Sequence, residues 1–148
     1  MGSVAVTVGS ADYVWAVPFD RRNLLHILQS MLSAVEKYGI AAPARVEIRL
    51  VDDNTMRTVN TRFMSCPGPT NVLSFPGGED MPGLILVSPG AVSRECLIYG
   101  QRPDEYMLLL LAHGVAHLAG FEHGPAMNTV CDICMAAARQ KLNSRTSC

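Results

Sequence analysis

The sequence predicts an α+β fold, with one small mixed β-sheet packed against several helices in a single domain spanning residues 1–148. Three observations support this prediction. The chain has 148 residues, of which 49% are apolar and 17% charged, so it can bury a core. Segments with the two-residue period of strands are interspersed with segments that have the longer period of helices. The chain contains no internal repeat or low-complexity run.

The first forty residues predict a strand followed by a long helix. Residues 4–8 alternate valine with small side chains, as a short strand does, and residues 9–18 read as a loop. Asp20 can cap a helix whose apolar stripe continues to about residue 38. Gly39 is a natural end for that helix, since glycine readily adopts a left-handed conformation.

A strand with one wet face and a short helix come next. In residues 44–51 apolar and charged side chains alternate strictly, so one face is expected to be buried and the other solvated. Asp52 or Asp53 can cap a short helix in which Met56 and Val59 are buried.

The middle of the chain predicts a pair of strands and a third helix. Residues 64–70 form a loop that is rich in proline and glycine, and residues 71–75 read as a strand. Residues 84–87 are continuously apolar, which is typical of a strand inside a sheet. Pro89 can open a helix that extends through about Ile98.

Two more helices complete the expected fold. Asp104 is expected to cap the first of them, which carries two of the chain's four histidines. Pro125 can open the last helix, which should fade near Asn143 and leave residues 144–148 as a frayed tail.

Charge and cysteine content indicate which binding partners and which cellular compartment to expect. The net charge is −1 and the pI is near 6.4, so composition alone gives no support for nucleic-acid binding. The number of cysteines is odd, and the sequence shows no apolar leader or membrane-length apolar run, which favours reduced thiols in the cytoplasm. Five cysteines are present: Cys66, Cys96, Cys131, Cys134 and Cys148. The Cys131–Cys134 pair has helical spacing and is read as buried core.

Three histidines within eleven residues form the most informative motif. His113 and His117 are four residues apart and would share one helix face, while His123 follows a glycine that can end the helix and turn the chain back. Three imidazoles with a vacant fourth position describe a catalytic zinc site, which activates water near neutral pH. The sequence therefore predicts one Zn²⁺ on a central helix and the turn that follows it.

A protease with this histidine spacing would carry a glutamate directly after the first histidine, as its general base. Here that position is Gly114. The missing base argues against peptide hydrolysis by that mechanism.

Two segments resemble the signatures of the YbeY family of bacterial endoribonucleases. The first is His-Gly-x-x-His-Leu-x-Gly-Phe-Glu-His, residues 113–123, with Glu122 where the family more often has aspartate. The second, residues 69–76, is Pro-Thr-Asn-Val-Leu-Ser-Phe-Pro and is similar to the family's Pro-Thr-Asp/Asn-Val-Leu-Ser-Phe-Pro. A weaker similarity extends from about residue 4 to residue 142.

This resemblance implies a metal-dependent, single-domain hydrolase that acts on phosphodiester bonds of ribosomal RNA. The implied roles are 16S rRNA 3′-end maturation and ribosome quality control, with RNA and the small ribosomal subunit as partners. It also implies that His113, His117 and His123 bind zinc. No membrane partner is expected, and the sequence leaves the oligomeric state open.

The chain departs from the family at an expected arginine. Ungapped comparison places Met64 where the family's arginine would be, and Arg62 lies two residues earlier. Phosphodiester cleavage needs a cation near the developing charge, so Arg62 is the candidate catalytic cation. Arg45 and Arg49, on the wet strand face, are candidate contacts to the RNA backbone.

Hydroxyl groups of the second signature are further candidates. Ser74 and Thr70 are candidates to orient water or phosphate, although such hydroxyls more often satisfy the backbone instead. Asn71 is expected at most to bind loop backbone.

Two other functions stay open at this point. One is a metal-dependent hydrolase of peptides or small esters, against which the glycine at 114 weighs. The other is a non-catalytic, zinc-stabilised factor that associates with the ribosome, which the departure at Met64 would explain.

Overall fold

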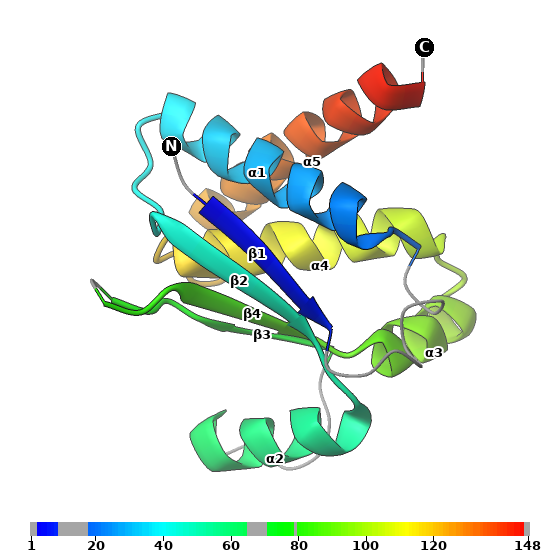
Figure 1. Cartoon of the computed structure of the whole chain (residues 1–148). Coiled ribbons are helices and arrows are strands. Elements are labelled where there is room, and N and C mark those ends of the chain that lie inside the picture. The colour runs from blue at the N-terminus through cyan, green and yellow to red at the C-terminus, as the bar shows by residue number, and fades with distance from the viewer. Residues whose placement is uncertain (1–2, 9–17, 65–70, 79, 147–148) are drawn as a thin grey trace.

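The order of helices and strands along the chain matches the expected order (Figure 1). A computed structural model describes residues 3–8, 18–64, 71–78 and 80–146. In these ranges the elements are β1 (Ser3–Val8), α1 (Arg21–Lys37), β2 (Arg45–Leu50), α2 (Asp53–Met64), β3 (Val72–Phe75), β4 (Gly83–Val87), α3 (Pro89–Tyr99), α4 (Pro103–Leu118) and α5 (Pro125–Thr146). The expected loops at 9–18 and 64–70 lie mostly outside the described residues, and Met64 belongs to α2.

The strands form one mixed sheet in the order β1-β2-β4-β3. β1 and β2 are parallel, as are β2 and β4, whereas β3 runs antiparallel to β4. The continuously apolar strand β4 has a neighbour on each side, which confirms its place inside the sheet. β3 is an edge strand, so one side of it lacks a partner among the described strands.

The two faces of the sheet are covered by different helices. Val46, Ile48 and Ile85 point into the main core, which also contains apolar side chains of α1, α4 and α5. Leu73 and Leu86 point the other way and pack with Met56 of α2. Figure 1 accordingly shows α2 apart from the other helices, across the sheet from α4.

Helix starts follow the capping rules with one exception. The Asp20 carboxylate accepts the Asn23 N–H at 2.7 Å, and Asp52, not Asp53, accepts the Thr55 N–H at 2.7 Å. The expectation that Asp104 caps α4 is wrong. The N-cap is Arg102 and the helix begins at Pro103, two residues earlier than a cap at Asp104 would give, because proline fits the first helical position, where its missing N–H costs nothing.

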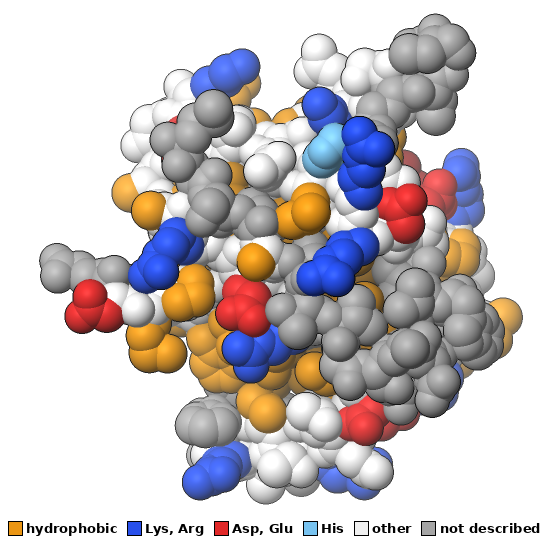
Figure 2. Space-filling model, viewed as in Figure 1, with side chains coloured by type: hydrophobic (Ala, Val, Ile, Leu, Met, Phe, Trp, Pro, Cys, Tyr) orange, Lys and Arg blue, Asp and Glu red, His pale blue; other side chains and the backbone are white. Residues whose placement is uncertain are grey.

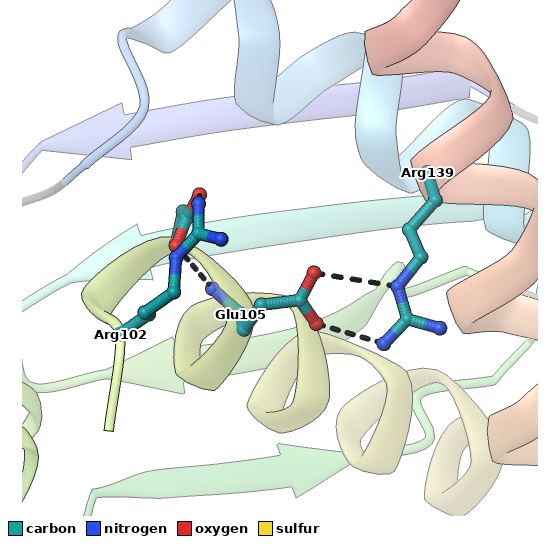
Figure 3. A network of polar contacts seen from close by, with 4 residues as sticks. Arg102, Glu105 and Arg139 are labelled. Atoms are coloured by element: carbon teal, nitrogen blue, oxygen red, sulfur yellow. Dashed lines mark hydrogen bonds and ion pairs between the residues drawn. The ribbon is translucent and has the colours of Figure 1, made fainter. Parts of the chain in front are cut away.

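α5 is longer than expected. It begins at Pro125, as predicted, but continues to Thr146, so residues 144–146 are helical and not a tail. Arg139 of α5 forms a two-pronged ion pair with Glu105 of α4, with nitrogen–oxygen distances of 3.3 and 2.8 Å (Figure 3). Such a pair ties the two helices together at their surface.

The buried side chains of the described residues are apolar except for Asn60 and Ser88. Cys131 and Cys134 are buried with free thiols, which confirms that this pair belongs to the core. Val59 is only half-buried, whereas Met56 is fully buried as expected. In the described ranges no helix is both long and apolar enough to cross a membrane.

Candidate functional site

The end of α4 turns the chain back on itself. The Gly120 N–H donates to the His117 carbonyl at 3.0 Å, and the Phe121 N–H donates to the Ala116 carbonyl at 3.1 Å. This is the Schellman pattern, which needs a left-handed residue, and Gly120 has φ 92°. Gly120, the helix end that the sequence predicted, therefore reverses the chain direction and brings residues 121–123 back toward α4.

The reversal places His123 against His117. Their ring centroids are 5.2 Å apart and the ring planes meet at 84°. The Nδ1 of His117 lies 2.9 Å from the Phe121 carbonyl oxygen, and since a carbonyl can only accept, Nδ1–H is the donor. The Nε2 of His117 is then the nitrogen left for a ligand. Metal-binding histidines commonly have their other ring nitrogen held in this way.

His113 lies one turn before His117, and its environment favours the neutral ring. Burial lowers the pKa of His113 below its ordinary value, and the neighbouring His117 and His123 lower it further. The neutral imidazole is also the form that binds a metal.

The chemistry of this donor set fits a metal, although the rings do not yet converge. In the described part of the chain, no three His, Cys, Asp or Glu side chains are already arranged to hold a metal ion. Binding would therefore require at least one ring to rotate. His123 is exposed, so its side chain has room to do so.

At Gly114, α4 packs closely against the sheet. A Cβ at this position would lie 3.1 Å from Ile85 Cδ1, 3.3 Å from Ile85 Cγ2 and 3.4 Å from Ser74 Oγ. Position 114 therefore faces β3 and β4. A glutamate here would be driven into the sheet, so the local packing adds a physical reason for the absence of the protease base.

Ser74 of β3 contacts the same turn of α4. Its hydroxyl donates to the Gly114 carbonyl oxygen at 3.2 Å. The hydroxyl proton therefore satisfies the helix backbone, while the oxygen keeps lone pairs that can accept a hydrogen bond. Of the two candidate catalytic residues, Ser74 is the one that lies beside the histidine-bearing helix.

The candidate cations lie on other parts of the surface. Arg62 is exposed in the last turn of α2, the helix that covers the opposite face of the sheet from α4. Arg45 and Arg49 are exposed on the outer face of β2, as the alternation predicted, and Arg49 pairs with Glu47 at 2.8 Å. Figure 2 shows basic side chains spread over the visible face, with acidic ones among them.

Two polar networks were not anticipated from the sequence. In one, Asp53 accepts hydrogen bonds from Ser88 and Arg94, each at 2.8 Å, and links α2 to α3. In the other, Glu95 of α3 accepts hydrogen bonds from Tyr106 at 2.7 Å and from Asn71 at 3.0 Å.

The sequence does carry a signal for one member of the second network. Tyr106 precedes His113 by seven residues, or two helical turns, so Tyr106 lies on the same face of the helix as His113.

Comparison with known proteins agrees with this fold and motif. A family model described as endoribonuclease YbeY matches residues 12–145. A protein named Endoribonuclease YbeY from Lawsonia intracellularis is 42% identical over 129 residues, covering 86% of this chain and 92% of the relative. One with the same name from Oleidesulfovibrio alaskensis is 36% identical over 154 residues, covering 87% and 89%.

A solved structure is similar as well. The solution structure of TM1509 from Thermotoga maritima has a TM-score of 0.64, with coverage of 96% of this chain and 93% of that one. Its sequence identity is 21%, so this likeness supports the fold alone.

Proposed function

The chain belongs to the YbeY family of endoribonucleases, and from this premise we propose that it cleaves ribosomal RNA with a zinc ion bound by His113, His117 and His123. One observation carries the proposal. In a chain of this family, the Schellman turn after α4 brings His123 against His117, one helical turn from His113, and His117 is already oriented through Nδ1. We further propose 16S rRNA 3′-end maturation, in the cytoplasm and on the small ribosomal subunit, as the specific task.

Each part of this site would have a distinct task. A zinc ion held by the three imidazoles would supply Lewis acidity to a phosphoryl oxygen and to a water molecule. The Phe121 carbonyl would keep His117 in the tautomer that presents Nε2. Ser74 would accept a hydrogen bond from water or position a phosphate with its oxygen, while its proton stays on Gly114.

Charge neutralisation would come from the arginines. Arg62 stays our candidate for a phosphate contact, although α2 lies across the sheet from α4, and Met64 occupies the position where the resemblance implies an arginine. Arg45 and Arg49 would contact the RNA backbone farther from the cut, Arg49 more weakly because Glu47 already pairs with it.

Peptide or ester hydrolysis is the less favoured activity. A zinc peptidase of this spacing needs a carboxylate after the first histidine, and position 114 packs too closely on Ile85 to hold one. The non-catalytic, zinc-stabilised ribosome factor is kept as an outcome of the test below.

The proposal is tested by incubating the zinc-loaded protein with an RNA that contains the 3′ end of 16S rRNA. The wild-type protein should cut it, and His113→Ala should not. His26→Ala is the matched control, because His26 lies on α1 and is outside the proposed ligand set. Equal cutting by wild type and His113→Ala would refute zinc-dependent cleavage at this site. Co-sedimentation with 30S particles without cutting would instead establish the non-catalytic factor.

A further inference from the structure

Asn71, Glu95 and Tyr106 form a polar network, named here the 71–95–106 network, where three elements meet. The Tyr106 hydroxyl of α4 donates to Glu95 Oε1 of α3 at 2.7 Å, and the Asn71 Nδ2 donates to the same oxygen at 3.0 Å. Asn71 Nδ2 also lies 3.5 Å from the Tyr106 hydroxyl. All three side chains are partly buried, so these contacts are shielded from water more than surface pairs are.

Protonation of the tyrosine keeps this network intact at neutral pH. Burial, together with the hydrogen bond to Glu95, raises the pKa of Tyr106 to about 12. The hydroxyl therefore remains a donor across the whole physiological range.

The network anchors one end of β3, and Ser74 anchors the other. Asn71 immediately precedes the strand, and its carbonyl also accepts the Ser88 N–H at 3.0 Å, so both its backbone and its side chain are held. Three residues later, the Ser74 hydroxyl donates to the Gly114 carbonyl. β3 is thus fastened to α4 at two places, once near Tyr106 and once at Gly114.

The spacing of the two anchors is nearly the same on strand and helix. From Asn71 to Ser74 the strand advances about 10 Å, at about 3.4 Å per residue. From Tyr106 to Gly114 the helix advances about 12 Å, at about 1.5 Å per residue. The match matters because β3 is an edge strand whose only partner in the described sheet is β4. The ladder to β4 sets the register of β3 in the sheet, and these side chains add its two hydrogen-bonded links to α4.

We propose that the 71–95–106 network positions β3 along α4 and thereby holds Ser74 against the turn that carries His113. Asn71, Glu95 and Tyr106 are then positioning residues that lie away from the reacting atoms. The inference rests on the proposed function only in treating the His113 turn as part of the active site.

The first experiment needs no activity. In Tyr106→Phe, which removes only the hydroxyl, the NMR signals of the Gly114 carbonyl carbon and the His113 amide should shift. Glu105→Gln is the matched control, since Glu105 is adjacent on α4 but pairs with Arg139 of α5 (Figure 3). It should leave both signals in place. Unchanged Gly114 and His113 signals in Tyr106→Phe, or equal shifts in both variants, would overturn the proposal.

The second experiment measures RNA cleavage in a double-mutant cycle. Asn71→Ala should lower kcat by about tenfold or more with little change in KM, because small misplacements of active-site groups slow the chemical step. In the Ser74→Ala background the same substitution should have almost no effect on kcat. A loss of equal size in both backgrounds would mean that Asn71 does not act through Ser74, and would refute the proposal. If the wild-type protein cuts no RNA, the proposed function fails, and the NMR comparison alone decides the positioning role.

Discussion

The contact between Gly114 and Ile85 gives a quantitative prediction about how α4 is held on the sheet. Two opposing terms act on Gly114→Ala. Alanine is better than glycine in a helix interior by about 1 kcal/mol. The new methyl group, however, would sit 3.1 Å from Ile85 Cδ1, and Ile85 is completely buried. Overpacking of this kind costs about 1–3 kcal/mol.

The net expectation for Gly114→Ala is a loss of stability of up to about 2 kcal/mol, the overpacking cost less the gain in helix propensity. The measurement is the free energy of unfolding in urea, followed by circular dichroism. Ile85→Val removes Cδ1, the closest atom, and alone should cost about 1 kcal/mol. In the Ile85→Val background the cost of Gly114→Ala should fall by about 1 kcal/mol or more, because the nearest remaining contacts are 3.3 and 3.4 Å. A stabilising Gly114→Ala, or an equal cost in both backgrounds, would refute close packing at this position.

Two further predictions concern the arginine position and acid stability. Met64→Arg restores the residue that the family resemblance implies, so it should raise the rate of RNA cleavage. Arg62→Ala should lower that rate by about tenfold or more. An unchanged cleavage rate in both variants would show that neither position takes part in the reaction. Hydrogen bonds from Arg94 and then Ser88 lower the pKa of Asp53, so the ionised carboxylate stabilises the fold at neutral pH and this contribution disappears as the pH falls below about 4. In urea titrations, the free energy of unfolding of the wild-type protein should exceed that of Asp53→Asn by a modest amount, because Asp53 is partly exposed. This difference should shrink as the pH falls. A difference in unfolding free energy that stays constant from pH 7 to pH 3 would contradict the stabilising role of the ionised Asp53.

Local signals predicted the elements well because the physics that sets them is local. Asp20 caps α1 through a contact three residues away, and Gly120 ends the histidine helix through its own φ angle. The alternation in β2 reports which side of the strand meets the core, and Arg49 is exposed accordingly. The histidine motif was recognisable for the same reason, since helical spacing and one glycine determine most of its geometry.

The errors and omissions arise where two signals compete or distant residues meet. At the start of α4, Asp104 is a good cap by residue type, but Pro103 fits the first helical position, so the helix starts two residues earlier than a cap at Asp104 would give. The role of Gly114 depends on Ile85, which is distant in sequence and reaches it only through the order of strands in the sheet. The partners of Asn71 were missed for the same reason, because they come from α3 and α4.

The zinc content of the purified protein tests the central claim most directly. Elemental analysis would compare the wild-type protein with His117→Ala and with the control His26→Ala, which changes a histidine of α1. We predict about one zinc ion per chain in wild type and in His26→Ala, and none in His117→Ala. Equal zinc in all three proteins, or no zinc in wild type purified without chelator, would contradict the assignment of His113, His117 and His123 as a zinc site.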